Sequence, residues 1–123
     1  MKSNHLFTNE NDRLKMILSG EYDFDDFVIY LKIIYAKCEN EGNFKMLLDA
    51  LGIEGIDIPT VERYYMGIEA AEQLNYKVKL AVVWHKEYVN YFGETVAVNR
   101  GANVGVFGST EQAIKWLLYD IKE

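Results

Sequence analysis

The sequence predicts an α/β fold, with a mixed sheet of four to five strands, an N-terminal antiparallel pair and about four helices around it. Two observations lead to this class. Residues 78–84 form an almost unbroken apolar run rich in β-branched side chains, typical of a strand buried on both faces. Residues 88–118 then read as helix, short strand and capped helix, the pattern of parallel βαβ units. The 123 residues suit a single domain spanning 1–123.

The first twenty residues are expected to form the antiparallel pair. A short edge strand is predicted around residues 5–7, followed by a turn at residues 9–12, where Asn, Asp and Glu gather. Residues 13–19 alternate, with Leu14, Met16 and Leu18 on one side, which indicates a strand with one buried face.

Asp23 is the predicted N-cap of the first helix. Its carboxylate suits this position, and Tyr22 and Phe27 have the spacing of a hydrophobic staple. The helix is expected to end between residues 39 and 42. Its core-facing side chains are predicted to be Phe27, Leu31, Ile34, Tyr35 and Cys38.

The middle of the chain predicts a strand at 44–50, a loop at 51–57 and a second helix that ends near Asn75. Pro59 fits the first turn of that helix. Its core-facing stripe is predicted to be Val61, Tyr64, Tyr65, Ile68 and Ala71.

A third helix is predicted over 88–100, and a short strand at 103–107 follows it. Gly101 is expected to end the helix in a left-handed conformation. The side chains predicted to face the core are Val89, Phe92 and Val96.

The last helix has a clear start signal. Ser109 and Gln112 have the spacing of a capping box. The predicted apolar face is Ala113, Ile114, Leu117, Leu118 and Ile121. The complete predicted order is β, β, α, β, α, β, α, β, α.

The composition argues against several function classes. A net charge of −6 and a pI near 4.9 disfavour binding to nucleic acid or to anionic membranes. The single cysteine, Cys38, excludes an internal disulfide, and no cluster of metal ligands is visible, so neither a metal nor a cofactor is predicted. Because residues 1–11 are not a secretory signal and no apolar segment is long enough to cross a bilayer, a cytoplasmic protein is expected.

Several short motifs are similar to those of a known family. They are Leu18-Ser19-Gly20 before the Asp23 helix, Leu47-Leu48-Asp49, Ala81-Val82-Val83, Asn99-Arg100-Gly101, Val104-Gly105-Val106-Phe107, Glu111-Gln112-Ala113 and Trp116-Leu117. Over residues 13–118 the chain resembles the SpoIIAA-like group of the STAS superfamily. The resemblance implies a non-catalytic regulatory module that binds a protein, as STAS antagonists of anti-sigma factors do.

The resemblance also implies a place for regulation. STAS antagonists are switched by phosphorylation of a serine at the start of the helix after the third strand. The corresponding residues 52–60 contain no serine, and Thr60 is their only hydroxyl, so Thr60 is the candidate phosphoacceptor. Pro59-Thr60 is equally an ordinary helix opening. Because other SpoIIAA-like proteins resemble lipid-carrier folds, a carrier or sensor of a small apolar ligand is the alternative function.

An enzyme is not predicted, although three suitable side chains are expected at the carboxyl ends of strands. Asp49, His85 and Ser109 would supply an acid, a base and a hydroxyl. Ser109 already has a role as a helix cap, and no G-x-S-x-G elbow is present. His85 lies beside Lys86 and Glu87 and is expected to be exposed.

Nine tyrosines and six phenylalanines are an excess, and they give the candidate functional face. The simplest interpretation places them in the core and at its boundary. The alternatives are a protein-binding face, for a partner or a second copy of the chain, and an apolar groove between the second and third helices. The residues of this predicted interaction or ligand face are Asp57, Thr60, Tyr64, Tyr65, Tyr88, Tyr91 and Phe92.

Overall fold

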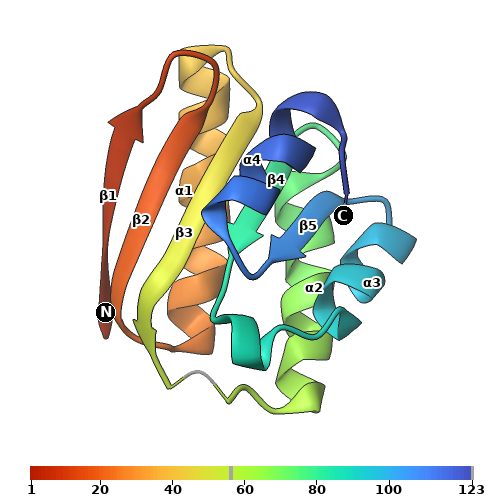
Figure 1. Ribbon diagram of the computed structural model, residues 1–123. Coiled ribbons are helices and arrows are strands. Elements are labelled where there is room, and N and C mark those ends of the chain that lie inside the picture. The colour runs from red at the N-terminus through yellow and green to blue at the C-terminus, as the bar shows by residue number, and fades with distance from the viewer. Residues whose placement is uncertain (56, 123) are drawn as a thin grey trace.

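The computed structural model describes residues 1–55 and 57–122, which form a five-stranded mixed sheet and four α-helices (Figure 1). The elements are β1 (Ser3–Asn9), β2 (Leu14–Glu21), α1 (Phe24–Glu41), β3 (Lys45–Glu54), α2 (Thr60–Leu74), β4 (Lys79–Val83), the 3-10 turn η1 (Lys86–Tyr88), α3 (Phe92–Asn99), β5 (Asn103–Phe107) and α4 (Thr110–Tyr119). The predicted fold class and element order are confirmed, including the edge strand β1.

The strands lie side by side in the order in which they occur in the chain. β1 is antiparallel to β2, and all the other pairs are parallel. Each parallel connection steps one strand in the same direction, and such connections are nearly always right-handed. The helices α1, α2 and α3 therefore pack on one face of the sheet, and only α4, which follows the last strand, covers the other face (Figure 1).

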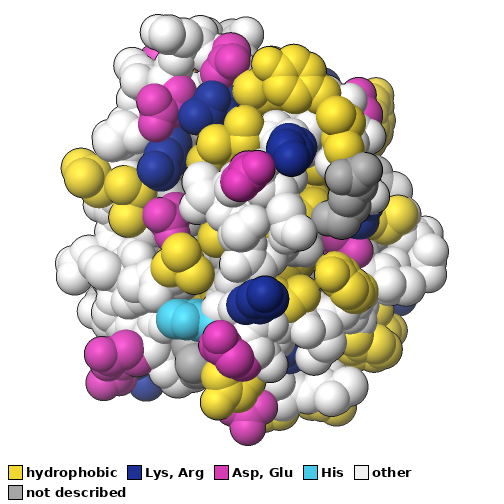
Figure 2. All heavy atoms as spheres, in the orientation of Figure 1, with side chains coloured by type: hydrophobic (Ala, Val, Ile, Leu, Met, Phe, Trp, Pro, Cys, Tyr) yellow, Lys and Arg dark blue, Asp and Glu magenta, His cyan; other side chains and the backbone are white. Residues whose placement is uncertain are grey.

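Each sheet face has its own core. The larger core joins alternate strand residues such as Met16, Leu48 and Leu80 to α1 and α2. The smaller core, under α4, consists of Leu47, Ala81, Val83, Phe107, Ala113 and Leu117. On the α4 face, none of the described helices covers the part of the sheet formed by β1 and β2 (Figure 1). Figure 2 shows this side, where hydrophobic side chains lie in separate groups between charged ones.

Both predicted N-cap residues are confirmed, but of the predicted capping box only the bond to Ser109 is present among the described residues. The Asp23 carboxylate accepts a hydrogen bond from the Asp26 amide at 3.1 Å, and the Ser109 hydroxyl accepts one from the Gln112 amide at 3.2 Å. Gly42 ends α1 with φ of 67°, a left-handed conformation that costs glycine little. Ile121, predicted on the face of the last helix, is exposed because Asp120 ends α4 before it.

The strand β3 continues four residues into the range 51–57, which was predicted to be a loop. Residues 51–54 continue β3, and residues 52–54 pair with β2 beyond a shift in register, where Ser19 faces Gly52. Residue 56 lies outside the described residues. Pro59 is the N-cap of α2, one position before the first turn in which it was predicted.

The side of α2 that faces the core differs from the predicted one. The buried residues are Gly67, Ala70 and Leu74, whereas Val61 is 70% exposed and Tyr65 is 53% exposed. The cause is the close packing of α3, because a Cβ at position 67 would lie 2.6 Å from the carbonyl oxygen of Gly93. Gly67 and Ala70 therefore lie where α2 approaches its neighbours most closely, and Leu74 completes the buried side nearer the end of the helix.

The third helix is also shorter than predicted. The range 88–100 is divided between η1 and α3, and the side-chain oxygen of Asn90 accepts a hydrogen bond from the Phe92 amide at 3.1 Å at the start of α3. The side of α3 that is fully buried carries Glu94 and Ala97, and Phe92 is exposed. The prediction that Phe92 faces the core is therefore wrong.

Candidate functional site: an apolar pocket and an aromatic face

An apolar pocket of about 130 Å³ lies between the sheet and the three helices on its larger core. The strands contribute Leu18, Leu48, Ala50, Leu80, Val82, Val104 and Val106, and the helices contribute Tyr30, Met66, Gly67, Ala70, Gly93 and Ala97. The exposed members of the lining are Glu21, the last residue of β2, and Asn90, which lies between β4 and α3. The pocket therefore meets solvent at the edge where open α/β sheets bind ligands.

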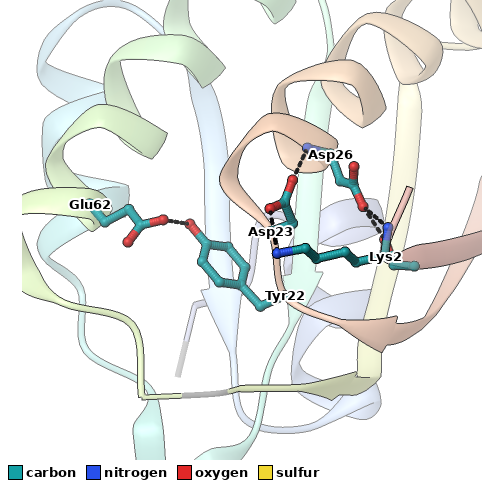
Figure 3. Close-up of polar contacts among 6 residues, drawn as sticks. Lys2, Tyr22, Asp23, Asp26 and Glu62 are labelled. Carbon is teal, nitrogen blue, oxygen red and sulfur yellow. Dashed lines mark hydrogen bonds and ion pairs between the residues drawn. The ribbon is translucent and has the colours of Figure 1, made fainter.

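The wall nearest the N-terminus contains a hydrogen-bonded polar group (Figure 3). One oxygen of Asp26 accepts hydrogen bonds from the Lys2 amide at 2.8 Å and from the Ser3 hydroxyl at 3.1 Å. The Ser3 hydroxyl also lies 2.7 Å from the Tyr30 hydroxyl. The ammonium of Lys2 is 3.6 Å from Asp23, so β1 is tied to the start of α1. Asp26 is buried, but its charge has partners.

Tyr22 connects the start of α1 to α2 across the pocket mouth (Figure 3). Its hydroxyl donates a hydrogen bond of 2.8 Å to Glu62. Burial, together with this bond to a carboxylate, raises the pKa of the Tyr22 hydroxyl well above its usual range. Tyr22 is therefore a neutral donor near neutral pH.

Of the other charged side chains in the lining, Arg63 and Glu94 make structural contacts. Arg63 donates hydrogen bonds to the carbonyl oxygens of Ile58 at 2.9 Å and Tyr88 at 3.2 Å. Glu94 accepts hydrogen bonds from the Val106 amide at 2.8 Å and from the Lys122 ammonium at 3.0 Å. These contacts hold the segments around η1 and α3 against α2 and β5.

Trp84 differs from the other polar residues of the lining. It lies directly after β4, is only 8% exposed, and its indole Nε1 is buried without a hydrogen-bond partner among the described residues. An indole N–H can only donate, and a buried donor without an acceptor costs free energy. Trp84 is thus the unsatisfied polar group of the pocket.

The aromatic residues of the predicted face come together only in part. Tyr64 is at the centre, with its ring 5.4 Å from that of Tyr65 and 6.5 Å from that of Phe92. Arg100 donates a hydrogen bond to the Tyr64 hydroxyl at 3.2 Å. Tyr88 and Tyr91 are exposed in the segment that leads into α3. We call Tyr64, Tyr65, Tyr88, Tyr91 and Phe92 the aromatic face.

Asp57 and Thr60 lie at the start of α2, and both are exposed. Thr60 is the first residue of the helix, and its N-cap, Pro59, supplies no side-chain acceptor. The predicted phosphoacceptor is therefore exposed at the start of a helix.

The three candidate catalytic residues each bond to backbone. Asp49 accepts a hydrogen bond from the Leu51 amide, the Ser109 hydroxyl from the Gln112 amide, and the ring of His85 lies 3.0 Å from the carbonyl oxygen of Ile53. His85 is half-buried, in contrast to its predicted exposure. This arrangement supplies no relay between base and nucleophile.

Two other findings concern reactivity and membranes. Burial raises the pKa of the Cys38 thiol to about 11. Among the described residues, no group of three or more His, Cys, Asp or Glu side chains could hold a metal ion. Within residues 1–55 and 57–122, the structure has no helix that combines the length and apolar character needed to span a bilayer.

The roles of Trp84, Arg63 and Glu94 were not predicted from the sequence. An inward-facing charge on a helix has no signature of its own, because its partners come from distant segments. The one available signal was the pair Gly67 and Gly93, which permits the close approach of two helices.

These elements and their order define an α/β domain with the fold of the anti-sigma factor antagonists, which confirms the predicted SpoIIAA-like (STAS) architecture. A similar solved structure is that of an anti-sigma factor antagonist from Mycobacterium paratuberculosis. It matches with a TM-score of 0.62 and 13% sequence identity over 94% of this chain and 93% of that chain. No family model and no curated protein matches the sequence.

Proposed function

We propose that this chain is a non-catalytic regulatory module that binds a partner protein through the aromatic face. The observation that carries the proposal is the exposure of Tyr65, Tyr91 and Phe92 on adjoining helices. Exposed aromatic residues are enriched at protein interfaces and often supply most of the binding energy. The structural neighbour, whose name describes it as acting on an anti-sigma factor, supports a regulatory protein of that kind as the partner.

Charge supports a partner of complementary composition. Asp57, three residues before α2, and Glu87, next to Tyr88, are exposed, and the chain carries a net charge of −6. A partner surface with an apolar centre and Lys or Arg at its rim would match this pattern, and the charges would mainly increase the association rate.

The test compares two variants for binding to a partner captured from the source cells and then purified. Tyr65→Ser combined with Phe92→Ser is expected to weaken binding at least about tenfold, because hot-spot aromatics contribute that much or more. Tyr76→Ser is the control, since Tyr76 is exposed after the end of α2, outside the aromatic face. Equal binding by both variants would reject the face. Sedimentation of the protein alone will show whether the partner is a second copy.

Thr60 is the proposed switch of this interaction. Phosphate at the first residue of a helix is favoured by the helix dipole, and it would add about two negative charges next to Asp57. Thr60→Glu is expected to change partner affinity, whereas Thr60→Val is expected to preserve it. Identical affinities of the two variants would count against the switch.

The pocket favours a second candidate function, a carrier or sensor of a small apolar ligand. Its lining is almost entirely apolar, and it opens at the ligand-binding edge of the sheet. Native mass spectrometry before and after denaturation tests this function. A bound compound that is released on denaturation is expected, and a ligand-free mass from freshly isolated protein contradicts it.

A further inference from the structure

The size of the pocket restricts what it can hold. Its volume is about 130 Å³. An engineered protein cavity of about 150 Å³ lined by apolar side chains binds a single benzene molecule. The pocket therefore suits one ring-sized molecule and is too small for a long acyl chain.

The charged groups of the lining restrict the ligand further. Asp26 and Glu94 already accept two hydrogen bonds each on one oxygen, and Arg63 donates to two carbonyl oxygens. None of these contacts needs a ligand to complete it. Asp23 is engaged by Lys2 and by the Asp26 amide, and Glu21 is exposed to solvent at the mouth, so neither offers a counter-charge inside the pocket. A charged ligand would therefore lose its hydration without gaining a counter-charge there, and the ligand is expected to be neutral.

One buried polar group of the pocket lining has no hydrogen-bond partner among the described residues. The Trp84 indole N–H is buried and has no acceptor among the residues that the structure describes, although Trp84 itself lines the pocket. Buried donors in folded proteins almost always have a partner. A ligand that carries one hydrogen-bond acceptor would supply it.

We propose that the pocket binds a neutral, ring-sized molecule whose single acceptor oxygen takes a hydrogen bond from Trp84 Nε1. This inference rests on the second candidate function, and it names the class of ligand: small cyclic ketones, esters or ethers. The ring contacts the apolar walls that surround Ala70 and Leu80, and the oxygen is directed to Trp84.

The experiment is a titration of the full chain, labelled with ¹⁵N, with cyclohexanone and with methylenecyclohexane, in which a CH2 group replaces the oxygen. The chain has two tryptophans, so Trp116→Phe assigns the two indole signals. Cyclohexanone is expected to shift the Trp84 Nε1–H signal saturably and to leave the Trp116 signal in place. It is also expected to bind about fivefold more tightly than methylenecyclohexane, as one neutral hydrogen bond allows.

Variants separate the pocket from the hydrogen bond. Ala70→Leu fills the pocket and is expected to abolish binding, whereas Ala36→Leu, on an exposed position of α1, is the matched control. Trp84→Phe removes the donor together with part of the ring, and both probes then meet the same enlarged pocket. The Gly93 amide signal is therefore expected to report equal affinities for the two probes. Absence of a saturable shift, or binding that survives Ala70→Leu, would overturn the proposal.

The outcomes also separate this inference from the functions on which it rests. Equal affinity of both probes for the unmodified protein would reject the Trp84 hydrogen bond and leave an apolar pocket. Saturable cyclohexanone binding with a ligand-free mass from cells would support the pocket chemistry and reject the carrier function. Neither result depends on Tyr65 and Phe92, which test protein binding.

Discussion

Gly67 of α2 lies against the backbone carbonyl of Gly93 in α3, so closely that a Cβ at position 67 would be 2.6 Å from that oxygen. Both glycines line the pocket. The distance between α2 and α3, and with it the shape of the pocket roof, therefore depends on the absence of one methyl group.

Gly67→Ala is accordingly expected to destabilise the protein by about 2 kcal/mol, because overpacking outweighs the better helix propensity of alanine. Gly93→Ala is the matched control. Its Cβ would lie 3.2 Å from the Arg63 carbonyl oxygen, a contact that small shifts can relieve. Urea unfolding of the two variants measures the difference, and a stabilised Gly67→Ala would show that the helices are not in close contact.

Removal of the Ser109 hydroxyl is expected to cost about 1 kcal/mol, because the Gln112 amide would lose its acceptor. Ser109→Asp should retain most of the stability, since aspartate is an equally good N-cap. Thermal unfolding of both variants provides the measurement. A loss of similar size in Ser109→Asp would indicate that the hydroxyl acts in some other way.

Lys79, at the start of β4, bonds to residues at the end of α4. Its ammonium donates hydrogen bonds to the Trp116 carbonyl oxygen and to Asp120, and it lies 4.7 Å from the centre of the Trp116 ring. The hydrogen bond and charge of Lys79 lower the pKa of Asp120. A carboxyl whose pKa is lowered on folding stabilises the protein above its unfolded pKa, and that contribution is lost as the pH falls through the folded pKa.

Asp120→Asn should therefore lower the melting temperature near neutral pH and have progressively less effect in acid. Asparagine tolerates the left-handed backbone at this position, where φ is 58°, so the substitution tests charge with little change in conformation. High salt should also reduce the difference, because Asp120 is exposed. A deficit that is constant with pH would exclude the ion pair as its cause.

Cys38 is expected to be inert to thiol reagents in the folded protein, because it is fully buried on α1. Its pKa rises to about 11 on folding, from about 8.5 in an unfolded chain. Between these values the unfolded chain releases the proton that the native protein keeps, so stability falls as the pH rises.

The check compares unfolding free energies at pH 8 and pH 10 for the unmodified protein and for Cys38→Ala. The unmodified protein should lose more stability, by up to about 1.4 kcal/mol per pH unit at the steepest point. Equal losses would mean that the thiol does not titrate differently on folding.

The sequence predicts strands and caps well because these depend on neighbouring residues. Alternation at Leu14, Met16 and Leu18 and the apolar run at 78–84 are local patterns, and Asp23 and Ser109 bond to amides three residues away. The orientation of α2 is different, because it is decided by the contact of Gly67 with another helix. The aromatic residues Tyr64 and Tyr65 had led to the prediction that the opposite side of α2 faces the core.

The sequence named the aromatic residues of the candidate site but not how they are oriented. Tyr65 and Phe92 were assigned both to this face and to core-facing stripes, and the structure places both at the surface, whereas the exposure of Thr60 follows from its position at the start of α2. The pocket could not be predicted, since its walls come from strands and helices that the sequence does not relate to one another. That the Trp84 indole N–H lacks an acceptor can be recognised only from the positions of the polar groups around it in the folded protein.

The sequential order of the strands also bears on how the chain reaches this structure. Each parallel strand pairs with the strand that precedes it in the chain, across a single helical connection, so every pairing closes a loop of similar, moderate length. A ribosome that releases the chain from its N-terminus would let β1, β2, α1 and β3 assemble before the remainder emerges. The pocket is completed only by the last third of the chain, and a prematurely terminated product would present its apolar walls to the proteins that survey nascent chains.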